Sequence, residues 1–503
     1  MSEVYRLFPE MGEFSEAGEA FFELVESLQS QEASHWEHGQ AEEFIEQRGR
    51  EVLRLAFQGY LNRRASQEER RHQVLGSDGV ERERCWESSS RALGTLFGEV
   101  KITRKRYSGS KAGSLFPLEA ELNLAADKYS DGLRKRVSQE ASRSSFDEAL
   151  ASLQEAAGQK IPKRQAEELT AKVAMDFEAF YQSRSGSEPE EKEDLLVLTF
   201  DGKGVVMRQE DLREATRRAA EREEGKRIGR LAPGEKRNRK RMAAVASVYS
   251  LSSLERSPEE IMGLWPSQRE GARPKPVGKR VWASLQREPE EVIEEAFQEA
   301  LWRDPQRKRQ WVVLVDGDEH QLERIEKAGK KYEVDLVIIL DFIHVLEYLW
   351  KAAYCFHPVG SAEAEEWVQW RAVAILRGDS SQVASGMRRS ATLRQLKNQE
   401  RKAVDKCADY LIKYRQYLRY NLYCWNGWPI ATGVIEGACR HLVKDRMELT
   451  GARWGLKTAE AILKIRALRS SGDWEDYWLF HKQQELQRNH LDRYAEDILE
   501  PAA

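Results

Sequence analysis

The sequence predicts an α/β protein whose sheet-forming segment lies between two long helical segments. Apolar residues recur at spacings of three and four in residues 1–75, 130–175 and 345–430, which is the period of a helix. Between residues 195 and 342, short runs rich in β-branched residues are expected to form four strands, 195–207, 242–251, 311–317 and 335–342. A chain of 503 residues is long enough for two to four domains.

Composition excludes several classes of protein. Hydrophobic residues make up 41% of the chain, which excludes wholesale disorder, and a net charge of −4 argues against a uniformly basic coat. Five cysteines without a CxxC pair exclude a disulfide scaffold and a standard zinc ribbon. We expect a cytoplasmic protein, because no signal peptide and no apolar run of membrane-spanning length is apparent.

The N-terminal region is expected to hold acidic helices followed by a β-hairpin. The first 60 residues carry 13 Asp and Glu against 4 Lys and Arg, so 1–75 is interpreted as an acidic helical pair that packs or dimerises. In the β-containing segment 76–125, residues 90–107 alternate apolar and polar side chains around Gly98, which predicts a hairpin. Its cluster of Lys and Arg at 101–106 either follows phosphates or forms a solvated strand face.

Residues 126–184 are expected to form short helices in the outline of a helix-turn-helix. Ser145 is a plausible N-cap of the second helix and Gly158 its stop. The third opens with Lys163 and Arg164, which would face DNA, although many ordinary helix pairs share this outline. A polar linker follows at 185–194.

Three predicted strands end in an aspartate: Asp201, Asp316 and Asp341. A single such residue is usually a turn former or helix N-cap. Three of them favour a shared role, because strand ends of an open α/β sheet converge where ligands bind. Carboxylates suit Mg²⁺, and two such ions can activate water for phosphodiester cleavage.

A fourth carboxylate lies on a predicted helix that starts near Thr432. Glu436, Arg440 and Lys444 recur every four residues and so share one face. They form either a solvated salt-bridge ladder or a metal ligand with two DNA contacts.

At these residues the chain resembles a family of bacterial insertion-sequence transposases, the ISKra type. The resemblance rests on FDGKGVVM (200–207), RPKPVGKRVWASL (273–285), VDGDEHQLERI (315–325), LDFIHVLEYLWKAAYCF (340–356) and IATGVIEGACRHLVKDRMELTGARWGL (430–456). Further matching stretches lie in the N-terminal region, so the resemblance covers most of the chain. It implies a DDE enzyme with an RNase H-like core spanning 195–344, an all-helical insertion at 345–430, and final core helices at 431–503.

The resemblance also implies residue roles. The metal-binding triad would be Asp201, Asp316 and Glu436, holding two Mg²⁺ ions that Mn²⁺ can replace. Asp318 and Asp341 are rivals for the middle position. His344, next to Asp341, would contact a phosphate or orient the metal site, and its alternative is a helix-start histidine bonded to backbone.

Two basic segments supply many of the candidate DNA contacts. One is the loop 225–241, which carries eight Lys and Arg and one Glu. A second run, 273–282, is also basic. Trp454 would stack on an unpaired base, whereas a helix tryptophan is more often part of a core. The full set of DNA-binding candidates is Lys163, Arg164, Lys226, Arg227, Arg230, Lys236, Arg237, Arg239, Lys240, Arg241, Arg440, Lys444, Arg446, Arg453 and Trp454.

The predicted function is therefore Mg²⁺-dependent DNA transposition. Its partners would be double-stranded DNA, as terminal inverted repeats and as target, and further copies of the chain in a homodimer or higher oligomer on DNA. No membrane contact is expected, and the DNA-bound protein would associate with the nucleoid. The alternatives are an RNase H-like nuclease or resolvase that cuts without joining, and a catalytically silent DNA-binding derivative. The acidic N-terminal helices are expected to lie away from the DNA path.

Overall fold

The chain folds into two compact units. The computed structural model describes residues 9–184, 194–223, 238–265, 274–449, 451–495 and 498. One unit comprises 1–180 together with 474–503, and the other comprises 181–473. The mixed α/β architecture is as predicted, but residues 474–503 belong to the first unit and not to the end of the core. Within the described residues, no helix is long and apolar enough to cross a lipid bilayer.

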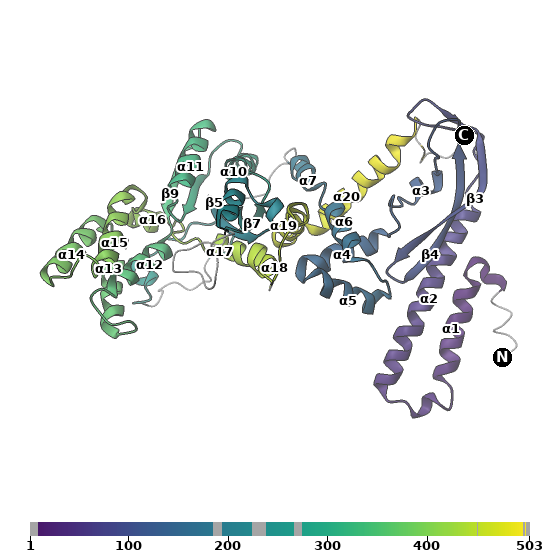
Figure 1. Ribbon diagram of the computed structural model, residues 1–503, viewed down its shortest axis with the longest axis horizontal. Coiled ribbons are helices and arrows are strands. Elements are labelled where there is room, and N and C mark those ends of the chain that lie inside the picture. Colours follow the sequence, from purple (N-terminus) through teal and green to yellow (C-terminus); the bar gives the residue numbers. More distant parts are fainter. Residues whose placement is uncertain are drawn as a thin grey trace. The chain divides into compact units, whose positions relative to one another are not determined.

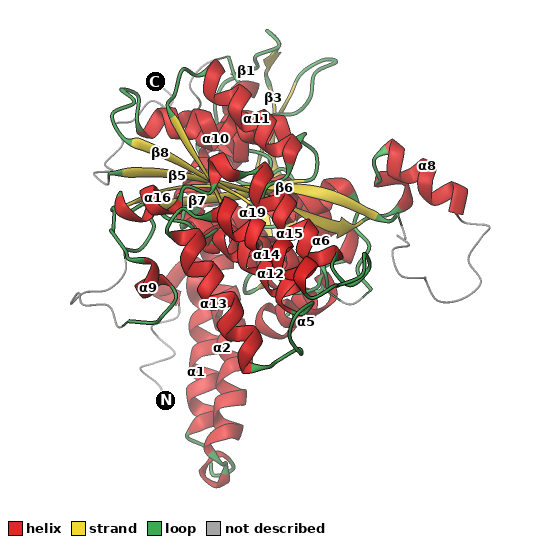
Figure 2. Ribbon diagram, turned by 90° about the vertical axis from the view of Figure 1, so that its left-hand side faces the viewer, coloured by secondary structure: helices red, strands yellow, loops and turns green. Residues whose placement is uncertain are grey.

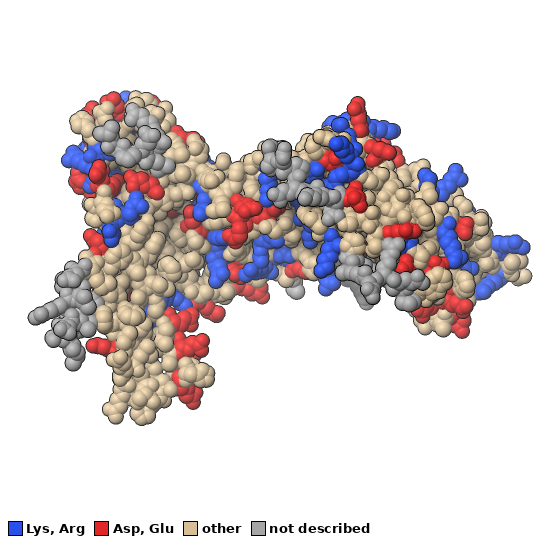
Figure 3. Space-filling view, turned by 180° about the vertical axis from the view of Figure 1, so that it is seen from behind, with Lys and Arg blue, Asp and Glu red and all other residues tan. Residues whose placement is uncertain are grey.

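The first unit begins with a pair of antiparallel helices, α1 (Ser15–Leu28) and α2 (His38–Ser66), which confirms the predicted helical pair (Figure 1). A capping box formed by Glu37 and Gln40 starts α2. On the face shown in Figure 3, this helical pair carries mostly Asp and Glu among its charged side chains. Helix α1 carries four Glu and no Lys or Arg, whereas α2 carries four Glu and five Arg, so the acidic charge of the pair lies mainly on α1.

The predicted hairpin is also present. Strand β3 (Arg84–Thr95) pairs antiparallel with β4 (Gly98–Ser108), and Thr95 lies opposite Gly98 at the turn, where Gly98 has a φ of 131°. Leu93 and Val100 pack against Leu61 of α2 in a small core. Two short strands, β1 (Val74–Leu75) and β2 (Glu81–Arg82), and helix α3 (Pro117–Glu121) complete this region.

Four helices follow the hairpin: α4 (Asp131–Arg143), α5 (Phe146–Ala157), α6 (Lys163–Val173) and α7 (Phe177–Arg184). The predicted boundaries of α5 are confirmed, because the Ser145 hydroxyl accepts a hydrogen bond from the Glu148 backbone and Gly158 ends the helix with a φ of 63°. The first two predicted helices are present, and the third, predicted over 161–180, is divided into α6 and α7; a role in reading DNA remains a prediction.

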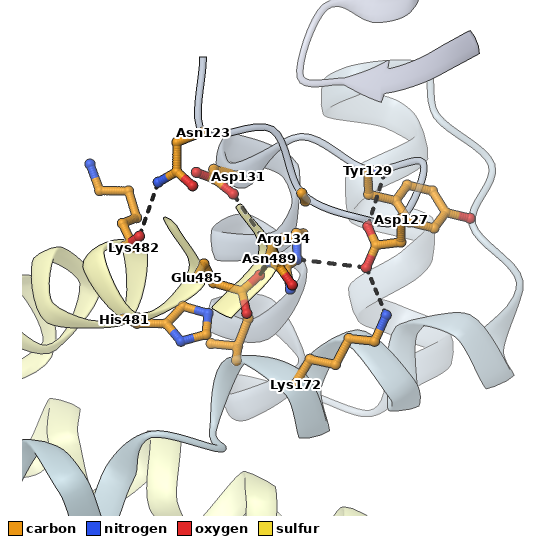
Figure 4. Close-up of polar contacts among 12 residues, drawn as sticks. Asn123, Asp127, Tyr129, Asp131, Arg134, Lys172, His481, Lys482, Glu485 and Asn489 are labelled. Atoms are coloured by element: carbon orange, nitrogen blue, oxygen red, sulfur yellow. Dashed lines mark hydrogen bonds and ion pairs between the residues drawn. The ribbon is translucent and has the colours of Figure 1, made fainter. Parts of the chain in front are cut away.

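Ion pairs hold the C-terminal helix α20 (Trp474–Asn489) to α4 (Figure 4) and to the short segment between α6 and α7. Arg134 is 1% exposed and donates to Glu485 of α20 over 2.8 Å. Asp176 accepts from His481 and Arg488 of α20, and although burial alone would raise its pKa, these partners hold that pKa below its ordinary value. The end of the chain is thus part of the N-terminal unit.

The second unit is built on a five-stranded mixed sheet in the order β7-β6-β5-β8-β9. Its strands are β5 (Leu195–Val206), β6 (Lys240–Leu251), β7 (Val277–Ser284), β8 (Gln310–Val315) and β9 (Leu336–Leu340). Strands β5, β8 and β9 run parallel, whereas β6 is antiparallel to both β5 and β7. The four predicted strands are confirmed, and β7 was missed.

Strand β7 buries one cation of the basic run 273–282, Arg280, whereas Lys275 and Lys279 are exposed and their contact with DNA stays a prediction. Arg280 is 5% exposed, donates to Glu295 and Glu299 over 2.6 and 2.5 Å, and lies 3.6 Å from the centre of the Tyr181 ring. A charge that is paired twice inside the protein is unavailable to DNA. This strand was missed because its Lys and Arg residues interrupt the apolar pattern that predicts a strand.

Helices cover both faces of the sheet (Figure 2). Helices α10 (Pro289–Arg303) and α11 (Glu319–Lys331) pack together on one face. The other face carries α17 (Gly433–Ala438), a π-helical turn (Cys439–Lys444) and α18 (Asp445–Met447). Helix α19 (Leu456–Ser471) packs near β7, and two shorter helices, α8 (Glu214–Glu223) and α9 (Pro258–Ile261), lie in the connections.

The predicted helical run between β9 and Glu436 is confirmed. It consists of α12 (Phe342–Ala353), α13 (Ala362–Leu376), α14 (Ser380–Leu393), α15 (Lys402–Lys413) and α16 (Tyr420–Trp425). In Figure 1 these helices form a cluster beyond β9, the edge strand of the sheet. This placement brings α15 and α16 to the carboxyl ends of β8 and β9.

Candidate active site

Three aspartates lie level with one another across the three parallel strands. The last paired residues of β5 and β8 are Thr199 and Leu314. Asp201 and Asp316 each follow two residues later, so continuing this register places them level with each other. The last pair between β8 and β9 is Val315 with Leu340, which sets Asp316 level with Asp341. Neighbouring strands are about 5 Å apart. The three backbones therefore present carboxylates along one sheet edge.

The sequence suggested that Asp201 ends its strand, but the strand continues beyond it. Strand β5 continues to Val206 by pairing with β6, whereas its pairing with β8 stops at Thr199. The Asp201 carboxylate accepts hydrogen bonds from its neighbour's backbone, Gly202 N to Oδ1 at 2.6 Å, and from the Cys439 thiol to Oδ2 at 3.0 Å. Both oxygens are thereby oriented, and one of their partners comes from the turn that follows Glu436.

Glu436 is connected to Asp341 through Thr432. The Thr432 hydroxyl donates to Asp341 Oδ2 at 2.6 Å and lies 3.5 Å from Glu436 Oε1. Thr432 precedes Glu436 by four residues, so both side chains lie on the same side of the helix start. Asp341 is 3% exposed and also accepts from Ile343 N at 3.0 Å as the N-cap of α12, whereas Glu436 is exposed.

The carboxylates influence one another electrostatically. Partial burial raises the pKa of Glu436, and the nearby charges of Asp341 and Asp201 raise it further. Burial raises the pKa of Asp341, and its bond from Thr432 opposes that increase. The raised pKa of Glu436 thus reports partial burial and nearby carboxylates, whereas that of Asp341 reports burial, and a cluster of perturbed carboxyl groups is a candidate functional site.

Asp316 and its rivals differ in environment. Asp316 is exposed and its Oδ1 accepts from Asp318 N at 3.1 Å, so its carboxylate is open to solvent. Asp318 acts as the N-cap of α11, accepting from Gln321 N at 2.8 Å, which is its ordinary structural role. Asp341 is buried and bonded on both oxygens. Of the three, Asp316 has the environment of a ligand that shares a cation with water.

His344 faces an aromatic cluster on the inserted helices. Its ring meets those of Tyr348 and Tyr410 edge-on, with centroids 5.5 and 6.2 Å apart, and its Nδ1 lies 3.9 Å from the carboxylate of Glu347. Its side chain is about one-third exposed, which leaves room for a ligand. Contact with a phosphate remains a prediction.

The donor set suits a hard cation, although the carboxylates are not gathered into a finished metal centre. Among the described residues, no three Asp, Glu, His or Cys side chains lie close enough to hold one ion. The available donors at the sheet edge are carboxylate oxygens, which are the ligands that Mg²⁺ prefers. Asp201, Asp316 and Glu436 each present a carboxylate that could serve as a ligand to such an ion.

A cleft of about 480 Å³ opens beside two of these acids. Its lining includes the acidic side chains of Asp201, Asp316, Asp318 and Glu288 and the basic side chains of Arg213, Lys240, Arg241 and Arg324. In Figure 3 the Lys and Arg side chains are interspersed with Asp and Glu on the visible face. The charges that line the cleft are balanced, and Arg213 pairs with Glu288, Arg324 with Glu290 and Lys240 with Glu448.

The helix that carries Glu436 changes its pitch immediately after that residue. The turn from Cys439 to Lys444 is π-helical, a local widening that often marks functional sites. Arg440 and Lys444 are exposed, and neither forms an ion pair with any residue that the structure describes. The salt-bridge ladder is therefore absent, which leaves both cations available to an anionic partner.

Two of the predicted DNA contacts are inside the protein. Trp454 is 6% exposed, donates from Nε1 to the carbonyl oxygen of Met447 at 3.0 Å, and pairs with Val206 and Arg208 through its backbone. Arg446 is 2% exposed and stacks on the Trp454 ring at 4.6 Å. Both side chains are structural, which corrects the expectation of base stacking. Arg453, between them in sequence, is exposed.

The remaining basic candidates are spread over the chain. Five of them, Lys226, Arg227, Arg230, Lys236 and Arg237, lie outside the described residues. Arg239 is exposed, Lys240 lies 3.3 Å from Glu448, and Arg241 donates to the backbone oxygen of Leu285 at 2.6 Å. In the first unit, Lys163 pairs with Asp147 and Arg164 with Glu168, at exposed positions.

Sequence reasoning overlooked Thr432 and Cys439. Both flank Glu436 on its helix, at four residues before and three after, and each contacts a different aspartate. Their spacing from Glu436 is a usable signal, since residues three and four apart share a helix face.

Comparison with known proteins adds little. No family model matches the chain, and no curated protein matches its sequence. A solved structure similar to this chain is the Drosophila P element transposase strand transfer complex, with a TM-score of 0.25 and 10% identity over 72% of this chain and 82% of that chain. A TM-score this low defines neither the fold nor the chemistry of the present protein.

Proposed function

We propose that this protein is a DNA transposase of the ISKra type with an RNase H-like core. The observation that carries the proposal is the level alignment of Asp201, Asp316 and Asp341 on three adjacent parallel strands, with Glu436 coupled to two of them. In this sheet β6 runs antiparallel to its neighbour β5, whereas β8 and β9 run parallel to β5. This arrangement supports an RNase H-like core.

Asp201, Asp316 and Glu436 would hold Mg²⁺ in this proposal. When bound, Mg²⁺ supplies activation of the attacking oxygen and stabilisation of the leaving oxygen in phosphodiester chemistry. The chain's own residues orient the carboxylates, since Gly202 and Cys439 fix both oxygens of Asp201, and Thr432 fixes the separation of Asp341 and Glu436. Arg213, Lys240, Arg241 and Arg324, which line the cleft beside Asp201, would contact the DNA backbone.

The roles assigned to the N-terminal unit are proposals as well. Helices α4 to α6 would recognise the terminal inverted repeats, and the acidic pair α1–α2 would make protein contacts between copies. Arg440 and Lys444 would hold the strand that Glu436 helps to cut, because both are exposed and lack ion pairs among the described residues.

The proposal is tested by a strand-transfer assay with the genomic DNA that flanks the gene. Wild-type protein with Mg²⁺ should cut at an element end and join the resulting 3′ hydroxyl to a target plasmid. Asp201→Asn and Glu436→Gln should lose both steps while binding DNA normally. Cut DNA without joined product would indicate the nuclease alternative, and DNA binding without cutting would indicate the silent derivative. Activity in Asp201→Asn would refute the metal site.

The middle acid is resolved by three matched variants, Asp316→Asn, Asp318→Asn and Asp341→Asn. We expect Asp316→Asn to abolish cleavage with unchanged thermal stability, because its carboxylate is exposed. Asp318→Asn should retain most activity, because asparagine also caps helices. Asp341→Asn should alter stability as well as activity, because that side chain is buried. Full activity in Asp316→Asn would transfer the role to a rival.

A further inference from the structure

Three tyrosine hydroxyls of the inserted helices donate hydrogen bonds to the backbone at the ends of β8 and β9. Tyr410 donates to the carbonyl oxygen of Asp316 at 3.2 Å, and Tyr414 to that of Gly317 at 2.9 Å. Tyr420 donates to the carbonyl oxygen of Leu340, directly before Asp341, at 2.8 Å. All three rings are buried, with exposed fractions of 8%, 8% and 0%.

These carbonyl groups lie at or just beyond the last paired residues of β8 and β9. The last pair between β8 and β9 joins Val315 and Leu340, so the backbone of Asp316 and Gly317 has no further strand pairing to hold it. A strand end without ladder partners opens more easily than the strand interior. The tyrosine hydroxyls supply the missing partners from outside the sheet.

The tyrosines are themselves fixed by ring packing. Tyr410 stacks on Tyr348 with centroids 4.3 Å apart and planes at 15°, and meets Tyr414 at 5.0 Å. Tyr420 meets Phe342 edge-on at 5.3 Å. Burial raises the pKa of Tyr410 and of Tyr420, so both hydroxyls stay protonated and act as donors at neutral pH.

The turn after β8 is shaped to receive this contact. Gly317 has a φ of 98°, and a Cβ built there would lie 3.2 Å from the Tyr410 hydroxyl and 3.0 Å from Leu340. A side chain at this position would push the turn away from the tyrosines. The DG pair at 316–317 therefore allows the Asp316 backbone to approach α15 closely.

We propose that the helices inserted between β9 and Glu436 serve as a positioning device, in which Tyr410, Tyr414 and Tyr420 hold the ends of β8 and β9. They fix Asp316 and Asp341 relative to Asp201, whose strand is anchored separately by β6. The effect of this positioning on catalysis rests on the proposed function. The three tyrosine hydrogen bonds themselves, here called the clamp, are a feature of the fold. The three tyrosines are positioning residues, because none of their hydroxyls is bonded to a candidate carboxylate.

The test compares Tyr410→Phe/Tyr414→Phe and Tyr420→Phe with a matched control, Tyr423→Phe. Tyr423 lies on α16 and its hydroxyl donates to the Gln416 carbonyl at 3.4 Å, away from both strand ends. Each change removes one oxygen and keeps the ring. Full-length protein is used throughout, and thermal unfolding shows whether each variant folds.

The first readout is hydrogen–deuterium exchange of backbone amides in 314–321 and 338–345. We expect exchange about fivefold faster in 314–321 for each hydroxyl lost from Tyr410 and Tyr414, and in 338–345 for Tyr420→Phe, because one such hydrogen bond contributes about that factor. The control should match wild type in both segments. Unchanged exchange in the variants would overturn the clamp, whatever reaction the protein catalyses.

The second readout is Mn²⁺ binding, followed by the electron paramagnetic resonance of the free ion, together with the Mg²⁺ concentration for half-maximal cleavage. The double variant should bind Mn²⁺ several-fold more weakly and need more Mg²⁺, with the rate restored at saturating Mg²⁺. A lower rate that Mg²⁺ does not restore, with unchanged Mn²⁺ affinity, would overturn the positioning role. If the variants exchange as predicted but wild-type protein neither binds Mn²⁺ nor cuts DNA, the proposed function is refuted and the clamp stands.

Discussion

Replacing Thr432 by valine should destabilise the second unit in a pH-dependent way. Valine keeps the shape of threonine and removes the hydroxyl that donates to Asp341 Oδ2 at 2.6 Å. Asp341 would retain Ile343 N at 3.0 Å and the weaker bond from the backbone of residue 432 at 3.4 Å. A hydrogen bond to a buried charged group contributes about 2 kcal/mol, and one to a neutral group about 1 kcal/mol.

The sign of the pH dependence follows from the pKa of Asp341. Burial raises that pKa above its ordinary value of 3.8 in the folded protein, so folding is favoured when Asp341 is protonated and this stability is lost as the pH rises through the folded pKa. The Thr432 hydroxyl lowers that pKa and so limits the loss. Without it, the folded pKa rises further, and the gap between variant and wild type widens with pH.

The assay is calorimetric unfolding of the full chain at pH 4.5 and pH 7. A loss of about 2 kcal/mol at pH 7 should lower the Tm of the second unit by about 5 °C, and the difference should be smaller at pH 4.5. Thr432→Ser is the matched control, since it keeps the hydroxyl and loses one methyl, about 1 kcal/mol at both pH values. A variant Thr432→Val no less stable than Thr432→Ser at pH 7, or equally destabilised at both pH values, would refute the reasoning.

Three further outcomes are expected. Arg440→Ala should weaken DNA binding about equally for all sequences and reduce the slope of log K against log salt concentration by about one, as measured by fluorescence anisotropy. The control variant Lys330→Ala on α11 should change neither the affinity nor the slope. An unchanged slope in Arg440→Ala would remove Arg440 from the interface. Trp454→Ala should cost about 3 to 5 kcal/mol of unfolding free energy because the ring is buried, so any loss of activity should accompany a loss of Tm. Glu485→Ala should cost about 3 to 5 kcal/mol in the first unit by leaving Arg134 buried without its closest partner, and a Tm change below about 2 °C would contradict the role of that pair in holding α20.

The strands and helices that carry a regular apolar pattern were predictable from the sequence. Strands β5, β6, β8 and β9 are rich in β-branched residues because both faces of the sheet are covered, and helix α5 has its cap at Ser145 and its stop at Gly158. Strand β7 escaped because Arg280 interrupts its pattern. Its charge is balanced by Glu295 and Glu299, which lie on a helix that only the folded chain brings near.

The acidic residues of the candidate site were predictable from the sequence, but their arrangement in space was not. Aspartates that follow apolar runs marked Asp201, Asp316 and Asp341, but their level alignment depends on strand register, which no local pattern fixes. Contacts across long separations in sequence, such as Tyr410 with Asp316, were likewise invisible. Trp454 was misjudged for the same reason, since its exposure is decided by packing against Arg446 and the end of β5.

The most direct test of the central claim is a single-turnover strand-transfer reaction with Glu436→Gln and wild-type protein. Both would be supplied with Mg²⁺, the DNA that flanks the gene and a target plasmid. The acid site predicts joined product from wild type, and neither cut nor joined DNA from Glu436→Gln at equal DNA occupancy. Joined product from Glu436→Gln at the wild-type rate would contradict the assignment of these carboxylates to the chemistry.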